Sequence, residues 1–371
     1  MIHALKNGTG NDKMFAVPKR EIEGMNKQDT KIRFGMIGSN YIVEQFMKNA
    51  ALCPDFELTA IYSRSYDKAK KIAEEKQAKY AFDDLEELAD CEEIDAIYIA
   101  SPTCCHAAQS IQMMKAGKHV LCEKPLASNS REVQEMYRVA KENHVFLMEA
   151  MRPAHNPNYD LLREQLPKLG KIRQVHLNYC QYSSRYDKFK DGIVENAFKR
   201  ELSNGAIMDI GCYCIHVMVM LFGKPEKIQA MGIQLPNSID GEGTINFSYP
   251  DFYGTVNYSK ITDSKQCNEI QGEEGILTFQ NLPNPDNMIF YNRNHRSGPE
   301  FLKQGKQENQ MESLTIEQIP YDMCYEINMF MEGIRSGKLN DCYEKYSIET
   351  MEIIDEARKQ MKITFPADEI E

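Results

Sequence analysis

Two hydrophobic patterns alternate over residues 31–151 of the chain. The run 96–100 is apolar throughout, which is typical of a strand covered on both faces of its sheet. Ile42, Phe46 and Ala50 instead recur at helical spacing on one face. The expected strands are 32–37, 57–62, 96–100, 119–122 and 145–149, and the expected helices are 42–50, 67–76, 83–88, 107–116 and 128–143. This alternation predicts a doubly wound parallel sheet with helices on both faces.

The pattern changes after Pro153. Ile245, Phe247 and Tyr249 alternate with polar residues, as in an antiparallel strand with one buried face. Similar segments predict strands at 172–182, 227–235, 244–249, 254–261, 267–272, 276–280 and 288–291, with turns at 240–241, 250–251 and 274–275. A loop is expected at 296–313, and helices are expected at 322–336 and 347–361. Together these segments predict an α/β region with a large, mainly antiparallel sheet.

The length of the chain and the change of pattern suggest its division. The chain has 371 residues, and at roughly 100–200 residues per domain this favours two domains. We place them at 31–152 and 153–371. Residues 1–30 hold a polar cluster and lack the apolar core of a secretory signal, so we expect a disordered extension there.

Charge narrows the range of partners. Lys and Arg number 44 against 55 Asp and Glu, which gives a net charge of −11. Because an acidic chain without a basic run repels nucleic acid and anionic lipid, we expect neither as a partner. The longest apolar run, 217–222, is far shorter than the ~20 residues that span a bilayer, so we expect no transmembrane helix.

The 11 cysteines are scattered along the chain, and none belongs to the CxxC pairs of zinc or redox sites. An odd number of cysteines without regular spacing is a poor disulfide framework. We therefore expect free thiols, no metal site, and a cytoplasmic location, where thiols stay reduced.

The first candidate site is the turn between the first strand and the first helix. Free amides and the helix dipole favour an anion such as a pyrophosphate there. The dinucleotide fingerprint GxGxxG would place glycines at 38, 40 and 43, but Asn40, which tolerates positive φ, and Val43 stand at the last two. A plain strand-to-helix turn therefore remains an alternative. The expected cofactor-binding residues are Gly38, Ser39, Asn40, Tyr41 and Ile42.

The end of the second expected strand carries Ser63 and Arg64, with Lys68 one turn later. An NAD site usually has an acidic residue there to bind the ribose 2′-hydroxyl, and this chain has none. The planar guanidinium of an arginine can bind two oxygens of a phosphate at once. These residues predict NADP(H) as the preferred cofactor. NAD remains possible, as does a purely solvated role for Arg64.

The segment Glu123-Lys124-Pro125 follows the expected strand 119–122. Because parallel sheets bind ligands beyond the carboxyl ends of their strands, Lys124 projects where chemistry is expected. Pro125 restricts the backbone on both sides of the bond. We expect partial burial to lower the pKa of Lys124 from about 10.4 toward neutrality, so that it can donate a proton.

With Ser101-Pro102-Thr103, His106 and the segment 205–213 (GAIMDIGCY), these marks resemble the glucose–fructose oxidoreductase / inositol dehydrogenase / rhizopine catabolism (Gfo/Idh/MocA) oxidoreductases. The resemblance covers residues 31–363. It implies an N-terminal Rossmann domain that binds NAD(P) and a C-terminal α/β domain with an open sheet, often used for oligomer contacts. We therefore expect a homo-oligomer, a dimer or tetramer, formed through that sheet.

Carried over residue by residue, the resemblance assigns Lys124 as the catalytic lysine and Asp209 as the aspartate of the family's D-x-G-x-H segment. Tyr213 stands at the histidine position, as in the dihydrodiol dehydrogenases of the family, and is the implied acid/base. A nearby cation would lower the pKa of its phenol and let the pair pass a proton. His216 is an alternative acid/base, although we favour a structural histidine bonded to the backbone.

The resemblance also implies further cofactor contacts. Arg152, at the domain junction, would touch the nicotinamide carboxamide or the substrate. The segment 182–187, rich in hydroxyls and charges, would line a polyol pocket or form a solvated loop. The remaining implied cofactor residues are Ser101, Pro102, His106, Glu123 and Lys124.

Taken together, these features predict an NAD(P)-dependent oxidoreductase that transfers hydride between a nicotinamide and a sugar, polyol or diol. Two alternatives stay open: a dinucleotide-binding regulatory protein without activity, and a nicotinamide-dependent glycosidase. The retained Lys124, Asp209 and Tyr213 argue against the regulatory protein, because it does not need a proton-transfer set.

Overall fold

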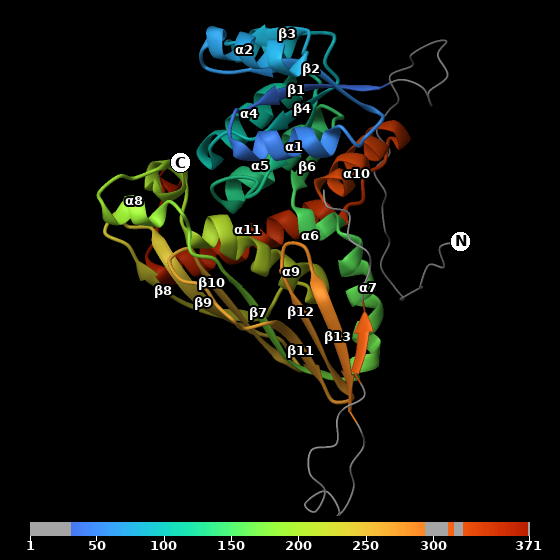
Figure 1. The fold of residues 1–371 in the computed structure, drawn as a ribbon, viewed down its shortest axis with the longest axis vertical. Coiled ribbons are helices and arrows are strands. Elements are labelled where there is room, and N and C mark those ends of the chain that lie inside the picture. The colour runs from blue at the N-terminus through green and yellow to red at the C-terminus, as the bar shows by residue number, and fades with distance from the viewer. Residues whose placement is uncertain (1–30, 294–310, 315–321, 370–371) are drawn as a thin grey trace, which may run out of the picture.

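The described part of the chain contains two sheets, one above the other in Figure 1, with helices between and around them. The computed structural model describes residues 31–293, 311–314 and 322–369. The extension expected at 1–30 and residues 296–310 of the expected loop lie outside the described residues.

The upper sheet has six parallel strands in the order β3-β2-β1-β4-β5-β6. The strands are β1 (Ile32–Ile37), β2 (Phe56–Tyr62), β3 (Tyr80–Phe82), β4 (Ala96–Ile99), β5 (His119–Glu123) and β6 (Leu147–Ala150). The strand order reverses between β1 and β4, which is where open parallel sheets bind ligands. The predicted Rossmann sheet is confirmed, while the hydrophobic pattern missed β3, whose three residues are only half-buried.

Helices cover both faces of this sheet, because each parallel connection has to cross over it. They are α1 (Tyr41–Ala50), α2 (Tyr66–Lys76), α3 (Leu85–Asp90), α4 (Thr103–Lys115) and α5 (Ser130–Glu142). Every residue of the central β4 is buried, as its continuous apolarity predicts.

The lower sheet has eight strands in the order β14-β13-β12-β11-β7-β10-β9-β8. All neighbouring pairs are antiparallel except β7 and β10, which run parallel in the middle. The predicted mainly antiparallel sheet is therefore confirmed. The strands are β7 (Ile172–Cys180), β8 (Lys227–Gln234), β9 (Asp240–Ser248), β10 (Tyr253–Ser259), β11 (Asn268–Gly272), β12 (Gly275–Gln280), β13 (Asp286–Asn292) and β14 (Met311–Leu314).

Two details of this sheet differ from the predictions. The turn expected at 240–241 lies inside β9, and the chain turns earlier, where Ser238 has a φ of 63°. Asp240 instead caps a helix, because its Oδ2 accepts a hydrogen bond from the amide of Ile207 at 2.6 Å. The loop expected at 296–313 includes part of β14, a mostly exposed strand without a buried face to mark it in the sequence.

Helices cover the face of the lower sheet that points toward the upper one (Figure 1). α9 (Cys212–Phe222) packs on β7 and β10, and α11 (Cys342–Met361) contacts both α5 above and β8 below. The short helices α6 (Arg152–His155) and α7 (Pro157–Gln165) follow directly after β6, and α8 (Tyr186–Lys190) lies in a side lobe. The start of α6 agrees with the expected domain boundary at 152/153, which itself stays a prediction.

Helix α10 (Met323–Ser336) belongs to the last part of the sequence but packs on the Rossmann core. The ring centroids of Phe330 and Phe34 lie 6.1 Å apart. The amide of Cys324 donates to Oδ1 of Asn49 at 3.1 Å. The chain therefore crosses back to the upper sheet after the last strand of the lower one.

One helical stretch, Arg200–Phe222, is long and apolar enough to cross a membrane by length and composition alone. The expectation of no such stretch counted uninterrupted apolar runs and therefore missed it. In the structure 83% of its most apolar window is buried inside the protein. This burial is what a core helix requires, and the stretch is the one that carries Asp209 and Tyr213.

Candidate active site

The turn after β1 passes close to the carboxyl end of the neighbouring strand β4. Gly38 has a φ of +130°, and a Cβ there would lie 2.7 Å from the carbonyl oxygen of Ala100. Only glycine fits this position. The turn leads directly into the start of α1, and because the amides of a helix N-terminus favour an anion, it fits a dinucleotide pyrophosphate.

Asn40 does not use the positive φ that its glycine-like position suggested, because its φ is −99°. Its Oδ1 accepts from the amide of Val43 at 3.3 Å, and its Nδ2 donates to the carbonyl of Ala100 at 3.0 Å. Asn40 thus caps α1 and ties the turn to the end of β4. Ser39 and Tyr41 beside it are exposed, and Ile42 is half-buried.

Arg64 and Lys68 are both exposed beyond the end of β2, and Ser63 is half-buried beside them. On the neighbouring α4, the thiols of Cys104 and Cys105 lie 3.8 Å apart. The contact with Cys104 and, secondly, the positive charge of Arg64 lower the pKa of the Cys105 thiol. Arg64 is therefore close enough to the first turn of α4 for its charge to act there, and an exposed guanidinium at this position can bind a phosphate.

Lys124 lies at the carboxyl end of β5, as predicted, and its peptide bond to Pro125 is cis. Its side chain is 14% exposed. Nζ donates to the main-chain oxygen of Asp209 at 2.8 Å and to Oδ1 of Asp209 at 3.0 Å. It also lies 4.7 Å from the centre of the Tyr213 ring. The structure thus brings all three predicted catalytic residues together.

The pKa of Lys124 shifts in the direction opposite to the prediction. Burial alone lowers it, but the neighbouring Tyr213 and Asp209 raise it well above its ordinary value. The prediction considered burial without the neighbouring charges, and an ammonium beside a carboxylate keeps its proton. Lys124 therefore acts as a fixed positive charge and hydrogen-bond donor.

Tyr213 is buried, and its hydroxyl accepts from Nη2 of Arg152 at 3.4 Å. The ring of Tyr179 on β7 packs against it edge-on at 5.8 Å. Burial raises the pKa of Tyr213 above its ordinary 10.0, while Lys124 and Arg152 act to lower it. Burial is the larger effect, so the predicted lowering is wrong for the ligand-free protein, and Tyr213 is a phenol at neutral pH.

Asp209 lies in a π-helical turn, Ile207–Gly211, that leads directly into α9. Such turns are frequent at functional sites. Its Oδ2 pairs with Nζ of Lys260 at 2.8 Å, while its Oδ1 pairs with Lys124. Burial alone raises the pKa of Asp209, but Lys260 and Lys124 together lower it below its ordinary value. Asp209 is therefore a carboxylate shared by two lysines.

Arg152 begins α6 and links Tyr213 on α9 to Asp322 beside α10. Its Nη1 lies 3.4 Å from Oδ2 of Asp322, at the start of α10.

Burial raises the pKa of Glu123, the residue before Lys124. Oε1 of Glu123 accepts from the hydroxyl of Tyr98 at 2.6 Å, inside the Rossmann core.

The predicted contact of His106 with the cofactor does not suit its position, because the side chain is only 1% exposed. Its Nδ1 lies 3.0 Å from the carbonyl oxygen of Pro125, and its Nε2 lies 2.9 Å from that of Ser101. His106 thus holds the ends of β4 and β5 together. Ser101 and Pro102 stay half-exposed at that edge, and their cofactor contacts remain a prediction.

His216 makes its polar contact with α11. It is buried on the side of α9 that faces α11, where its Nδ1 lies 3.3 Å from the hydroxyl of Thr350. Burial lowers its pKa to about 3. Its structural role was predicted, but its partner is a side chain rather than the backbone.

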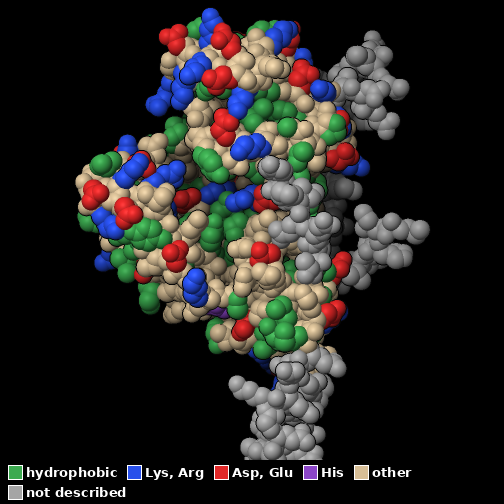
Figure 2. Space-filling view, in the orientation of Figure 1, with side chains coloured by type: hydrophobic (Ala, Val, Ile, Leu, Met, Phe, Trp, Pro, Cys, Tyr) green, Lys and Arg blue, Asp and Glu red, His purple; other side chains and the backbone are tan. Residues whose placement is uncertain are grey.

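The segment 182–187 lies on the side lobe with α8, and its polar groups bond to one another. The hydroxyl of Tyr182 donates to Oδ1 of Asp187 at 2.7 Å and accepts from Lys190 at 2.9 Å. Figure 2 shows a hollow between this lobe, the Rossmann part above and the lower sheet, with charged side chains visible inside it. The lobe can therefore form one wall of a polar pocket.

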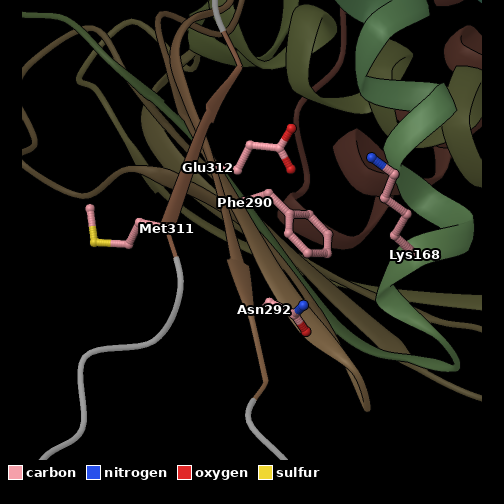
Figure 3. A pocket seen from close by; sticks show the side chains of 5 residues that line it. All are labelled: Lys168, Phe290, Asn292, Met311 and Glu312. Carbon is pink, nitrogen blue, oxygen red and sulfur yellow. The ribbon is translucent and has the colours of Figure 1, made fainter.

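A second hollow, of about 550 Å³, lies far from these residues on the lower sheet. Figure 3 shows Phe290 of β13 and Glu312 of β14 pointing toward Lys168, while Met311 points the other way. It holds none of the predicted site residues, and its lining consists of Lys168, Phe290, Asn292, Met311 and Glu312.

Three residues that the sequence analysis missed contact the site: Lys260, Tyr179 and Asp322. Lys260 had a signal, because it is a charged residue inside the segment 254–261 that was predicted to be a strand. Such a charge is costly to bury unless it is paired. The other two had none, since neither lies in a motif.

Comparisons with known proteins identify the family of this chain. The family model for the oxidoreductase family with an NAD-binding Rossmann fold (GFO/IDH/MocA) matches residues 32–151. The model for the GFO/IDH/MocA C-terminal domain matches residues 165–278. Both matches lie where the two sheets lie.

Named relatives span nearly the whole chain. The scyllo-inositol 2-dehydrogenase (NADP(+)) IolU of Bacillus subtilis is 43% identical over 91% of this chain and 99% of its own length. The trans-1,2-dihydrobenzene-1,2-diol dehydrogenase of Mus musculus is 28% identical over 91% and 99%.

Among solved structures, KijD10, a 3-ketoreductase from Actinomadura kijaniata in complex with NADP and TDP-benzene, has a TM-score of 0.75. It covers 90% of this chain and 98% of its own, at 20% identity, which supports the fold alone. The matched family models and the relative at 43% identity show that this chain belongs to the GFO/IDH/MocA family of oxidoreductases.

Proposed function

We propose that the protein is an NADP(H)-dependent dehydrogenase that interconverts a secondary hydroxyl and a carbonyl on a cyclic polyol, a sugar or a diol. The observation that carries the proposal is the set of contacts among Lys124, Asp209, Tyr213 and Arg152 between the two sheets, in which the Tyr213 ring is buried and the three charged side chains are partly exposed. A phenol flanked by two cations can move one proton to or from a substrate oxygen.

The residues of the chain supply the proton transfer. The bound nicotinamide supplies or accepts the hydride. In the reducing direction Tyr213 donates its phenolic proton to the carbonyl oxygen, and Lys124 and Arg152 stabilise the phenolate that results. In the oxidising direction the phenolate takes the hydroxyl proton, so an alcohol and NADP⁺ give a carbonyl, NADPH and a proton.

The choice of NADP(H) is supported by the basic side chains beyond β2. Arg64 and Lys68 are exposed and unshielded at the point where the ribose 2′-position of a dinucleotide lies in this fold. The relative IolU is named as an NADP(+) enzyme. Gly38 and the capped start of α1 would hold the pyrophosphate.

The substrate class is supported by the relatives and by the hollow. IolU is named for scyllo-inositol, and the murine relative is named for a cyclic trans-diol. Both are rings with neighbouring secondary hydroxyls. The polar lobe beside the hollow in Figure 2 offers hydroxyl and charged groups that such a ring can bond to.

A screen tests this proposal. NADPH absorbance is followed with inositols, sugars, cyclic diols and their keto forms, with NAD(H) as a parallel series. We expect turnover of at least one cyclic polyol with NADP(H). Tight NADP(H) binding without turnover of any compound would contradict the proposal and favour a regulatory protein. Cleavage of a glycoside without net change in absorbance would favour a glycosidase instead.

We also propose a homo-oligomer formed through the outward face of the lower sheet, and a reducing compartment. Met231, Ile233 and Tyr253 on that face are 66%, 53% and 54% exposed. Large exposed apolar side chains that share a face often mark an interface. All 11 cysteines lie within the described residues and are free. Sedimentation of Met231→Asp against wild type would test the interface, with a shift to monomer expected.

A further inference from the structure

Lys260 is the residue directly after β10, and its backbone is held from both sides. Its amide donates to the carbonyl of Gly241 at 2.9 Å, and its carbonyl accepts from the amide of Ser183 at 2.9 Å. The side chain is only 2% exposed. The position of its ammonium is therefore determined by the sheet and not by solvent.

The ammonium of Lys260 makes three contacts inside the protein. Nζ pairs with Oδ2 of Asp209 at 2.8 Å, donates to the carbonyl of Ala197 at 2.7 Å and lies 4.7 Å from the centre of the Phe198 ring. Removing an ammonium from water is costly, and pairing repays this cost only with good geometry. Stability alone would be served as well by an apolar side chain.

Asp209 provides one negative charge to two ammoniums. If Lys124 were its single partner, the carboxylate would neutralise most of the charge of Lys124. Because Lys260 takes the second oxygen, part of that negative charge is balanced from the far side. The positive charge of Lys124 then acts more fully on the Tyr213 ring, 4.7 Å away.

We propose that Lys260 is a positioning residue for the proton transfer, because it shares the Asp209 carboxylate with Lys124 and so keeps the charge of Lys124 effective at the hydroxyl of Tyr213. The proposal rests on the proposed dehydrogenase function. Lys260 acts through Asp209, since its ammonium contacts Asp209, Ala197 and Phe198 rather than Tyr213.

Loss of the charge of Lys260 has a predictable sign. The phenolate of Tyr213 would be less stabilised, so its proton would leave at a higher pH. The rise of oxidation rate with pH would then move upward by about one pH unit, which is about a tenfold loss at neutral pH. The other titratable or charged groups that face Tyr213, Asp209 or Lys260 are Lys124, Arg152, Glu123, Cys212, Tyr179 and Asp240.

The experiment compares wild type with Lys260→Met, Lys260→Gln and Lys260→Arg. One readout is the pH profile of kcat in the oxidising direction. A second is the ultraviolet titration of Tyr213, obtained by subtracting the same titration of Tyr213→Phe, which needs no substrate. We expect the neutral variants to shift both curves upward and Lys260→Arg to restore them.

Lys118→Met is the matched control. Lys118 is also a buried lysine, but it donates to the carbonyls of Cys91 and Ile94 and precedes β5, at the opposite end of that strand from Lys124. We expect its loss to lower thermal stability without moving either curve. A merely structural Lys260 would behave in the same way.

Unshifted curves in the neutral Lys260 variants would overturn the proposal, and so would equal shifts in Lys118→Met. If Lys260→Met does not fold, Lys260→Gln keeps a hydrogen-bond donor for Ala197 and carries the same test. If wild type turns over no substrate, the proposed function fails, while the Tyr213 titration still decides the role of Lys260.

Discussion

The β2 end and the β5 end of the Rossmann sheet both carry positive charges, but the charges are exposed at the first end and largely buried and paired at the second. At the end of β2, Arg64 and Lys68 are exposed and reach into solvent. At the end of β5, Lys124 is 14% exposed and Lys260 only 2%, and both are tied to one carboxylate. The first end offers separate charges to a ligand, whereas the second holds a coupled network.

This difference implies different behaviour under mutation. Exposed charges are screened by salt and act nearly independently of one another. Buried charges share partners, so the loss of one leaves another unpaired and shifts the pKa of the rest. We therefore expect changes at the β2 end to affect which dinucleotide binds, and changes at the β5 end to affect the reaction itself.

The largest effect is expected for Lys124→Met. It removes the donor beside the reacting oxygen and leaves Oδ1 of Asp209 without its ammonium. We expect kcat to fall by about 1,000-fold or more, within the range of lost acid–base and electrostatic catalysis. Fluorescence titration with NADPH should show binding nearly unchanged. Persistent turnover would contradict the expectation that changes at the β5 end affect the reaction itself.

Tyr213→Phe should lower kcat by about 100-fold, since it removes the proton but keeps the ring. Because burial raises the pKa of Tyr213, the phenol persists at neutral pH. The rate of reduction by wild type should therefore stay constant around neutral pH and fall in the alkaline range, while the rate of oxidation should rise in the alkaline range. Rates in both directions measure this, and the alkaline rise should vanish in Tyr213→Phe. An unchanged profile in the variant would assign the proton to another group.

Arg64→Ala should raise the KM for NADP⁺ by about tenfold or more, which corresponds to the loss of a charge-assisted hydrogen bond. The KM for NAD⁺ and the kcat should hardly change. Lys68→Ala, one helical turn away, is the matched comparison and should cost about twofold to fivefold, as a single exposed charge does. The rise in KM for NADP⁺ in both variants should become smaller when salt is added. An equal rise in KM for NADP⁺ and NAD⁺ would show that Arg64 does not bind the 2′-phosphate.

The Rossmann half was largely predictable because its signals are local. Gly38, Arg64 and Lys124 each follow a strand whose apolar run is visible in the sequence. Their place at the sheet edge then follows from the rule that ligands bind beyond strand ends. The pattern missed β3, because three half-buried residues show no period.

The lower half was predictable as a sheet but not as a site. Asp209 and Tyr213 were identified through a family motif, while Lys260 and Asp322 reach the same place from positions about 50 and 110 residues further along the chain. The directions of the pKa shifts at Lys124 and Tyr213 were also wrong. A shift depends on which of burial and neighbouring charge is larger, and that needs distances.

Helix α10 has a practical consequence for work with separate parts of this enzyme. Its Ile327 and Phe330 complete the core around Phe34, and Cys324 bonds to Asn49. A fragment cut after β6 would expose that apolar surface to water and would be prone to aggregate. Exchange of cofactor domains between relatives should therefore transplant α10 together with residues 31–151, although some 170 residues separate the two in the sequence.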